Sequence, residues 1–432
     1  MNIVILGLSV TSSWGNGHAT TYRSLVRGLA ARGHRLLFLE RDMPWYAGNR
    51  DMPQPPGTEV ALYRDFSELP ARFEPTVERA DLVIVGSFVP EGKRVGEWAT
   101  TVAKGVTAFY DIDTPITLAM LESGACDYLS PELIPRYRLY LSFTGGPTLG
   151  RIESRYGSPM ARVLHCSVDP DQYRPADGSV RWDLGYLGTY SADRQPALDR
   201  LLVEPACRWS AGRFAVVGPM YPAEIAWPAN VARTIHLSPR EHPGFYAQQR
   251  YTLNITRAVM IAAGFSPSVR LFEAGACGVP ILSDYWNGLE TLFRPGREIL
   301  IVDSADDVLR RLFDTPDEER RAIGARARRR ILAGHTPFHR ATQLECYFQE
   351  AYDRRSSRPA RRNRGNRKKD HRLAAGSDAD GGGRRPGETP GGTTRQGPLR
   401  GDLQQPAGED DGHRRATGAG ARLDGSTLRS RR

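Results

Sequence analysis

The sequence predicts an α/β protein of two Rossmann-like, doubly wound domains that face each other across a cleft, and three observations lead to this prediction. Short apolar runs alternate with amphipathic stretches up to about residue 353, a pattern typical of parallel strands that are covered by helices. The alternation is interrupted once, by a stretch rich in Pro, Asp and Gly at residues 167–182. The chain of 432 residues is also long enough for two cores, because a single domain usually holds ~100–200 residues.

The first domain is expected to span residues 1–166. A helix with Leu25, Leu29 and Ala30 on one face is predicted over residues 22–32, because apolar residues at this spacing share one side of an α-helix. Continuous apolar runs predict strands that helices bury on both faces. These runs lie at residues 3–8, 36–39, 82–85, 106–110, 139–143 and 162–166.

A second α/β series follows a predicted linker at residues 167–182, and we expect this second domain to span residues 183–334. A further helix is predicted over residues 335–353. Because open α/β sheets bind ligands beyond the carboxyl ends of their strands, we expect a binding cleft between the two domains. The predicted strands are 184–187, 213–217, 234–237, 252–255, 279–283 and 298–302, and the predicted helices are 195–207, 242–249, 268–275, 305–313 and 316–333.

The formal charge of +10 belongs to the end of the chain. Residues 354–432 hold 20 Lys and Arg against 9 Asp and Glu, whereas the preceding part holds 39 against 40. The near-neutral body gives no reason to expect a nucleic-acid partner. The tail has almost no apolar residues, so we predict that it is disordered. It is open to three interpretations: a basic arm for nucleic acid or anionic lipid, an inert extension, or an out-of-frame reading of the end of a GC-rich gene.

The sequence also argues against a membrane-spanning, secreted or zinc-binding protein. No apolar run approaches the ~18 residues of a membrane span, and the first ten residues lack the features of a signal peptide. The five cysteines include no C-x-x-C pair, which favours a reducing compartment. We therefore expect a cytoplasmic protein without a transmembrane segment, with peripheral association at the inner membrane face left open.

The first predicted strand leads into a glycine-bearing loop at the start of a helix. Gly15 and Gly17 precede His18 there, and such a loop brings backbone N–H groups close to an anionic or hydroxyl ligand. His18 is a candidate general base or acceptor contact, against the alternative of a capping or solvent-exposed histidine. Glu40 lies where an acid binds ribose in dinucleotide-binding folds, but the glycine spacing is not G-x-G-x-x-G.

Two acids and a second histidine follow later strands of the first domain. Asp111 and Asp113 are two residues apart at a strand end, so on an extended segment they would point the same way. Asp111 is a candidate base, and Asp113 is either an acceptor-side residue or a helix cap. His165 ends the last strand before the linker and is expected to face the cleft on the acceptor side.

The second domain carries the more informative residues. Arg194 follows a strand and a glycine turn near a predicted helix start, an arrangement suited to a diphosphate; the alternative is an arginine on a solvated helix end. Ser266 and Ser268 supply small donors before a helix. Arg270 lies in the first turn of that helix, and Glu273 follows three residues later on the same side. A carboxylate there suits the hydroxyl groups of a ribose or a sugar.

The second domain contains SPSVRLFEAGACGVPILSDYWNGLETLFRPGREI, and the linker contains SVDPDQYRP. These segments resemble the donor-binding domain and the interdomain segment of GT-B glycosyltransferases, closest to the CgeB-like (spore maturation protein) group, with a C-terminal domain similar to glycosyl transferases group 1. The likeness covers roughly residues 1–353. It implies an N-terminal acceptor domain, a C-terminal donor domain and a last helix that crosses back to the first domain.

The resemblance also implies the reaction. A sugar would move from a nucleotide-diphosphate donor to an acceptor hydroxyl, without a cofactor and without a metal. By position, Glu273 matches the donor-binding glutamate, Arg194 and Arg270 match diphosphate contacts, and the two serines match the loop donors. Many retaining enzymes of this fold have another glutamate eight residues before the one that Glu273 matches. This chain has Phe265 at that position. The donor site with two glutamates is therefore incomplete.

Three alternatives remain open at this stage. Phe265 is compatible with a non-catalytic nucleotide- or sugar-binding protein on the same scaffold. A nucleotide-sugar epimerase would have the same fold and the same diphosphate site. A protein that binds nucleic acid or the cell envelope through its basic tail is the third. The acceptor (a glycan, a lipid or a protein), the donor base and sugar, the stereochemistry and the oligomeric state have no readable signature.

Overall fold

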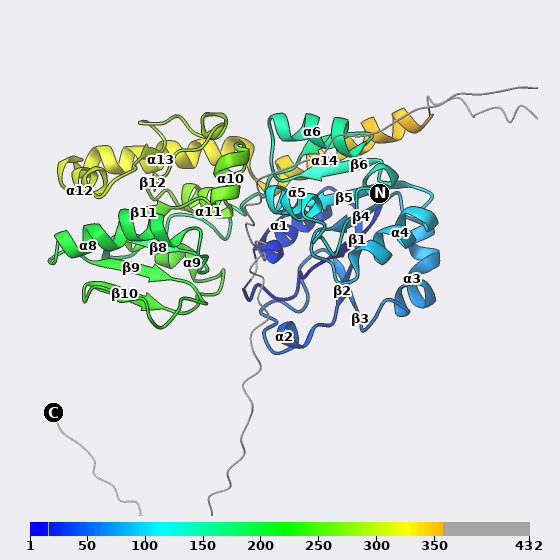
Figure 1. The fold of residues 1–432 in the computed structure, drawn as a ribbon, viewed down its shortest axis with the longest axis horizontal. Coiled ribbons are helices and arrows are strands. Elements are labelled where there is room, and N and C mark those ends of the chain that lie inside the picture. The colour runs from blue at the N-terminus through cyan, green and yellow to red at the C-terminus, as the bar shows by residue number, and fades with distance from the viewer. Residues whose placement is uncertain (16, 357–432) are drawn as a thin grey trace, which may run out of the picture. The chain divides into compact units, whose positions relative to one another are not determined.

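A computed structural model describes residues 1–15 and 17–356. Within this part of the chain, seven parallel strands form a first sheet in the order β3-β2-β1-β4-β5-β6-β7 (Figure 1). The order reverses between β1 and β4, as in doubly wound folds. The strands are β1 (Asn2–Gly7), β2 (Arg35–Arg41), β3 (Glu59–Tyr63), β4 (Leu82–Gly86), β5 (Val106–Asp111), β6 (Leu139–Ser142) and β7 (Ala161–Val163).

Helices cover both faces of this sheet. Successive side chains of β1 point to opposite faces: Ile3 and Ile5 pack in one apolar cluster with residues of α1 and α14, and Val4 and Leu6 pack in another with residues of α3 and α4. The helices are α1 (His18–Ala31), α2 (Pro44–Ala47), α3 (Glu68–Arg79), α4 (Gly92–Val102), α5 (Thr114–Glu122), α6 (Pro147–Tyr156) and the short 3-10 helix η1 (Ile134–Arg136).

The second sheet has six parallel strands among the described residues, in the order β10-β9-β8-β11-β12-β13. This order reverses between β8 and β11, so each sheet has one switch point where loops diverge to the two faces. The strands are β8 (Trp182–Leu187), β9 (Phe214–Val217), β10 (Val231–Thr234), β11 (Gln249–Asn254), β12 (Ile281–Ser283) and β13 (Leu300–Ile301).

The helices of the second half also lie on both faces of its sheet. Leu184 and Leu253 pack with α8 and α12 residues in one apolar cluster, whereas Ile281 packs with α11 and α13 residues in another. The elements are α7 (Gln195–Leu198), the π-helical turn η2 (Asp199–Val203), α8 (Glu204–Arg208), α9 (His242–Ala247), α10 (Ala258–Ala263), α11 (Val269–Cys277), the 3-10 turn η3 (Leu289–Thr291), α12 (Ala305–Asp314) and α13 (Asp317–Gly334).

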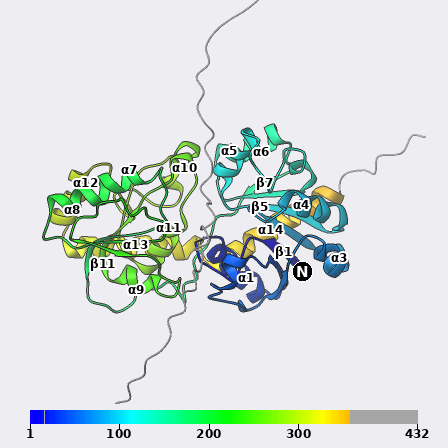
Figure 2. The same ribbon diagram turned by 60° about the horizontal axis from the view of Figure 1, so that its bottom comes forward.

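One apolar cluster joins the two halves. It contains Phe272 of α11, Tyr173 and Val168 of the segment between the sheets, and residues of the first sheet. The last helix, α14 (Pro337–Ser356), follows the second sheet in sequence but packs against α1 of the first half, and Figure 2 shows the two helices next to each other. The described residues belong to one compact unit.

The largest differences from the sequence prediction concern two strands. Helix α10 was also not predicted, and the helix predicted at 195–207 consists of α7, η2 and α8. The strand predicted at 234–237 lies instead at β10, because Val231 pairs with Phe214 in the ladder, whereas Ile235 is 77% exposed beyond it. Strand β3 was not predicted. It is an edge strand of which only Tyr63 is buried, so it has no continuous apolar run. Most other predicted strands agree with the structure within about two residues, although β7 and β13 are shorter than expected.

Two further expectations concern membranes and the tail. Among the described residues, no helix is long and apolar enough to cross a bilayer. The predicted disordered tail, residues 354–432, lies almost entirely outside the described residues.

Candidate functional site

A cavity of about 280 Å³ lies where loops of the two sheets meet. Its walls come from the segments that follow β1, β8, β9, β10 and β11. These segments leave the carboxyl ends of their strands, where open α/β sheets bind ligands. The first half contributes Ser13, Gly15, Gly17 and Thr20, and the second half contributes Leu187–Thr189, Arg194, Val217–Pro219, His236, Leu237, Pro239, His242, Ser268–Arg270 and Glu273.

Arg270 provides a fixed positive charge in this cavity. Its Nε donates to the Leu187 carbonyl at 2.5 Å and its Nη1 to Asn254 Oδ1 at 3.0 Å. The guanidinium lies 4.6 Å from the ring centre of Tyr186. The side chain is therefore held in one orientation before any ligand binds, so little of its conformational entropy would be lost on binding an anion.

Arg194 lies across the same cavity, at the residue before α7. Its Nη2 donates to the Thr189 carbonyl at 2.5 Å. Its buried Nε has no hydrogen-bond partner within the described part of the chain. A buried donor without a partner is costly, and an oxygen-rich ligand in the cavity would satisfy it. This is the second positive charge that the sequence predicted for a diphosphate.

Glu273 lies one turn after Arg270 on α11 and is only 5% exposed. Its Oε1 accepts from the Tyr173 hydroxyl at 2.9 Å, and its Oε2 accepts from the Tyr246 hydroxyl at 3.3 Å. Burial raises the pKa of both tyrosines well above 10, so they are hydrogen-bond donors at neutral pH. His242 Nδ1 lies 3.4 Å from Oε2. The carboxylate is thereby oriented at the edge of the cavity.

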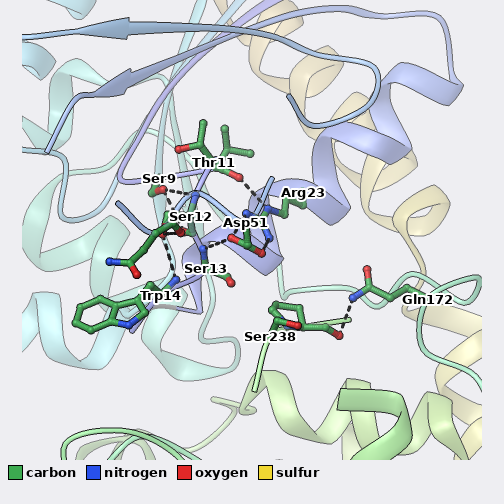
Figure 3. Close-up of polar contacts among 12 residues, drawn as sticks. Ser9, Thr11, Ser12, Ser13, Trp14, Arg23, Asp51, Gln172 and Ser238 are labelled. Carbon is green, nitrogen blue, oxygen red and sulfur yellow. Dashed lines mark hydrogen bonds and ion pairs between the residues drawn. The ribbon is translucent and has the colours of Figure 1, made fainter. Parts of the chain in front are cut away.

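The loop after β1 forms the opposite wall and is held by two acids. Glu40, at the end of β2, is fully buried and accepts from the backbone N–H groups of Val10 and Thr11 at 2.6 and 3.0 Å, and from two side-chain hydroxyls. Asp51 accepts from Ser13 N at 2.8 Å and pairs with both terminal nitrogens of Arg23 (Figure 3). Glu40 thus shapes the loop instead of binding a ribose.

His18 and Asp113 form a close pair behind this wall. His18 Nε2 lies 2.9 Å from Asp113 Oδ2, and the ring is 5.7 Å from that of Phe88 in an edge-on arrangement. Asp113 precedes α5 but its side chain does not cap the helix. His18 Nδ1 is buried and has no hydrogen-bond partner among the described residues. The pair joins two residues that the sequence nominated separately.

The arrangement of the two sheets is similar to that in solved structures of other proteins. The sucrose-phosphate synthase of Thermosynechococcus elongatus aligns with a TM-score of 0.58 and 14% identity over 82% of this chain and 100% of its own. Anabaena HepE, in complex with UDP and glucose, aligns with a TM-score of 0.61 and 14% identity over 81% and 100% of the two chains. The chain has the GT-B fold.

A third solved structure and a family model are also similar to this chain. An alpha-glucosyltransferase in complex with UDP-glucose and DNA that contains an abasic site aligns with a TM-score of 0.59 and 12% identity, over 80% of this chain and 99% of its own. The family model described as glycosyl transferase-like matches residues 194–345, which is the half that carries Arg194 and Glu273. No curated protein matches the sequence significantly.

Asp111 does not face the GT-B cleft, contrary to its nomination as a base. It is fully buried at the end of β5, where Tyr140 donates to Oδ2 at 2.6 Å and Thr117 to Oδ1 at 2.7 Å. Burial raises the pKa of this carboxyl to about 6. The chain turns after the strand, with φ −123° and ψ 48° at Asp113, so the two acids do not share one side.

His165 and Ser266 also lie outside the cavity. His165 is packed between the rings of Phe143 and Phe272, and burial lowers its pKa to about 3. Because β7 ends two residues earlier, His165 belongs to the buried crossing between the halves. Ser266 is fully buried and its Oγ accepts from Thr144 Oγ1 at 2.9 Å. Its neighbour Ser268 does line the cavity and donates to Asn254 Oδ1 at 2.7 Å.

Several cavity residues carry no signal in the sequence. Thr20 and His236 lie in stretches without a recognisable motif. Tyr173 does not line the cavity, but it orients Glu273 from one hundred positions away in the sequence. Gly15 and Gly17, which the sequence analysis assigned to an acceptor-side loop, also line this cavity. In the part of the chain that the structure describes, no group of three or more His, Cys, Asp or Glu side chains is arranged to hold a metal ion.

Proposed function

We propose that this protein is a glycosyltransferase, of the hexosyltransferase type, that moves a sugar from a nucleotide-diphosphate donor to an acceptor hydroxyl. The observation that carries the proposal is the cavity in which two arginines and a buried, oriented carboxylate of the second half face the glycine loop of the first. The match of that half to the glycosyl transferase-like family model supports it.

In this proposal, charged side chains of the second half bind the diphosphate and the ribose of the donor. Arg194 and Arg270 bind the diphosphate, together with the free N–H groups at the start of α11, which follow Ser268. Glu273 accepts the ribose hydroxyl groups. As the bond to the sugar breaks, the two guanidinium groups stabilise the charge that develops on the leaving diphosphate. The proposal therefore needs no metal or cofactor, and the nucleotide sugar is a substrate.

The pair of His18 and Asp113 would supply the base. The acceptor oxygen attacks the anomeric carbon, the bond from that carbon to the diphosphate breaks, and the proton of the acceptor hydroxyl moves to His18 Nδ1, the ring nitrogen without a partner within the described residues. Asp113, 2.9 Å from Nε2, stabilises the protonated ring. A direct displacement of this kind inverts the configuration at the anomeric carbon.

UDP-glucose is the first donor to test, because it or its products are bound in the HepE and alpha-glucosyltransferase structures. The acceptor is proposed only as a hydroxyl of a glycan, a lipid or a protein. The assignment to the CgeB-like group, the cytoplasmic location and any association with the inner membrane face stay predictions.

Turnover of the full-length chain with a panel of nucleotide sugars tests the proposal, with release of the nucleoside diphosphate as the signal. His18→Ala should lower turnover by roughly 10²–10⁴-fold while donor binding persists, because general base catalysis is worth about that much. Asn49→Ala, at an exposed site on the same half, is the control. Donor binding without turnover would favour the non-catalytic alternative, and an isomerised donor would favour the epimerase.

A further inference from the structure

We propose that the acceptor of this protein is an alcohol with an aliphatic, lipid-like body, and that this body lies on a surface here called the apolar rim. The rim consists of Phe88, residues 116–121 of α5, and α10. The inference rests on the proposed function, which leaves the class of acceptor open, because it concerns the molecule whose hydroxyl reaches His18. The residues of the rim are not among those that line the donor cavity.

Phe88 brings an aromatic ring to the proposed base. Its ring lies edge-on to that of His18, with 5.7 Å between the two centroids. The residue follows β4, where the strand order of the first sheet reverses and where such sheets bind ligands. Its φ of +60° is left-handed, a conformation that is rare for a bulky residue and that clusters at functional sites. The ring is half-buried, so the base has an apolar surface on one side.

The turn that carries Phe88 is held to the strand that leads to Asp113. Ser87 N donates to the Tyr110 carbonyl at 2.9 Å, and Ile112 N donates to Ser87 Oγ at 3.1 Å. Ser87 is fully buried, so water does not compete for these bonds. The first half therefore places the ring beside the base before any ligand binds.

The apolar surface continues from Phe88 onto α5. The Phe88 ring lies 4.6 Å from that of Tyr128, and the Tyr128 hydroxyl lies 2.8 Å from Thr117 Oγ1 of α5. This helix begins directly after Asp113. Between residues 116 and 121, Thr117 is the only polar residue, and it is buried. The exposed and half-buried side chains of this segment are therefore all apolar: Ile116, Ala119, Met120 and Leu121.

Helix α10 extends this surface on the second half. It contacts α5, and Figures 1 and 2 both show the two helices next to each other. Its six residues are the apolar sequence AVMIAA, yet none of them is buried, and Ile261 is 39% exposed. A helix that is apolar on every side is normally buried, and exposed apolar patches mark binding surfaces. We therefore infer that a ligand covers α10.

The chemistry of the apolar rim and its position favour one kind of ligand. The exposed side chains of the two helix segments carry no charge and offer no hydrogen bond to the hydroxyl groups of a glycan. Neither segment contains an aromatic ring on which a flat molecule could stack, whereas Met120 and Met260 adapt to a flexible chain. Because the rim begins at the base, a ligand that lies on it reaches His18 with its hydroxyl. An aliphatic chain that ends in a hydroxyl fits both conditions.

The apolar rim positions the acceptor and leaves the bond changes of the proposed reaction as they are. The oxygen of the alcohol forms the new bond to the anomeric carbon, the diphosphate leaves with the electron pair of the broken bond, and the hydroxyl proton passes to His18. The products are an alkyl glycoside and a nucleoside diphosphate. A chain bound on the rim holds its hydroxyl at the base and excludes water, which would otherwise compete as the acceptor.

Binding of 1-octanol to the full-length chain tests the apolar rim without any donor. Ile261→Lys places a charge on α10. Val180→Lys is the matched control, because Val180 is also 39% exposed but lies in the segment between the two sheets. Calorimetric titration should show a dissociation constant for octanol that rises roughly tenfold or more in Ile261→Lys and stays within about twofold in Val180→Lys.

Phe88→Asn tests the part of the rim that lies at the base. Asparagine tolerates the left-handed conformation of this position better than most residues, so the variant replaces the ring by a polar group without added backbone strain. It should also weaken the binding of 1-octanol, because the amide loses bonds to water when the chain covers it. Unchanged binding would remove Phe88 from the apolar rim.

Turnover tests the class of acceptor. In the presence of the donor that the protein uses, 1-octanol should increase the release of the nucleoside diphosphate, whereas maltose, a glycan, should not. Ile261→Lys should raise the KM for octanol, while the dissociation constant of the nucleoside diphosphate stays within about twofold, because Ile261 does not line the donor cavity.

The outcomes distinguish this inference from the proposed function. Turnover with maltose but not with 1-octanol would overturn the inference and leave the proposed function standing. No binding of octanol to the wild type, or equal effects of Ile261→Lys and Val180→Lys, would also overturn it. So would a dimeric wild type whose Ile261→Lys variant is monomeric, because a second copy of the chain would then cover α10. Octanol binding that Ile261→Lys abolishes, in a protein that never turns over a nucleotide sugar, would support the rim as a site for an aliphatic alcohol and refute the proposed function.

Discussion

The two halves of the molecule use the polar residues at their strand ends in different ways. In the first half, Glu40 and Asp111 are fully buried, and donors of the same half satisfy them. In the second half, Arg194, Arg270 and Glu273 line the cavity. Glu40 and Asp111 therefore stabilise the structure of the first half, whereas the charged side chains of the second half are held in place at the cavity. An acid at a strand end is not by itself a sign of catalysis.

Glu40→Ala tests this structural role and should have the largest effect. The substitution leaves two buried backbone N–H groups and two hydroxyls without their acceptor, so the free energy of unfolding should fall by roughly 3–5 kcal/mol. Chemical denaturation measures this loss. Glu59→Ala, an exposed glutamate on neighbouring β3, is the control and should change stability little. A loss in Glu40→Ala no larger than in the control would contradict this role.

Asp111→Asn tests the same role through its pH dependence. Burial raises the pKa of Asp111 to about 6, above the value of about 4 in an unfolded chain. Between pH 4 and pH 6, Asp111 is therefore protonated in the native state and ionised in the unfolded state. The stabilisation that results from this difference in pKa is complete below pH 4 and is lost as the pH rises through 6. Relative to the asparagine variant, the wild type should lose about 2–3 kcal/mol of unfolding free energy between pH 4 and pH 7.

Denaturation of both proteins at the two pH values gives this difference directly. Because all other groups are shared, their titration cancels in the comparison. A difference that does not change with pH, or that grows in favour of the wild type as the pH rises, would show that the buried carboxyl has no raised pKa.

Tyr173→Phe tests the second half and should have the smallest effect. It removes one hydrogen bond to Glu273, at 2.9 Å, and leaves the ring in place. Nucleotide affinity should fall by about 1 kcal/mol, or roughly fivefold. Tyr137→Phe is the matched control, since the buried Tyr137 hydroxyl has no hydrogen-bond partner among the described residues. Calorimetric titration measures the affinity of both variants for the nucleotide. Equal affinities would contradict the assignment of Glu273 to the donor site.

The fold was largely predictable because most strands are buried on both faces and read as apolar runs. Strand β3 was not predicted because this edge strand lacks such a run. The prediction of a strand at 234–237 was wrong because Ile235, although apolar, is exposed. Apolar character alone does not reveal which residues the sheet buries.

The site was predictable where its geometry is local. Arg270 and Glu273 lie on one helix face, so their spacing brings them to the same cavity. The pair of His18 and Asp113 spans 95 positions and depends on β5 lying two strands from β1 in the sheet. Both residues were nominated from the sequence, but their contact was not. Asp111 and His165 were misplaced because strand ends and turns decide which side chains are buried.

The most direct test of the central claim is a calorimetric titration of the full-length chain with a panel of nucleoside diphosphates. Arg194→Ala is compared with Arg200→Ala, which removes an exposed arginine one turn and a half further along the same helical segment. We predict that one nucleotide binds the wild type and the Arg200 variant equally, and that Arg194→Ala weakens it by about 2 kcal/mol, or roughly thirtyfold. Binding that both variants weaken equally, or no binding of any nucleoside diphosphate to the wild type, would contradict the assignment of the second half as the donor site.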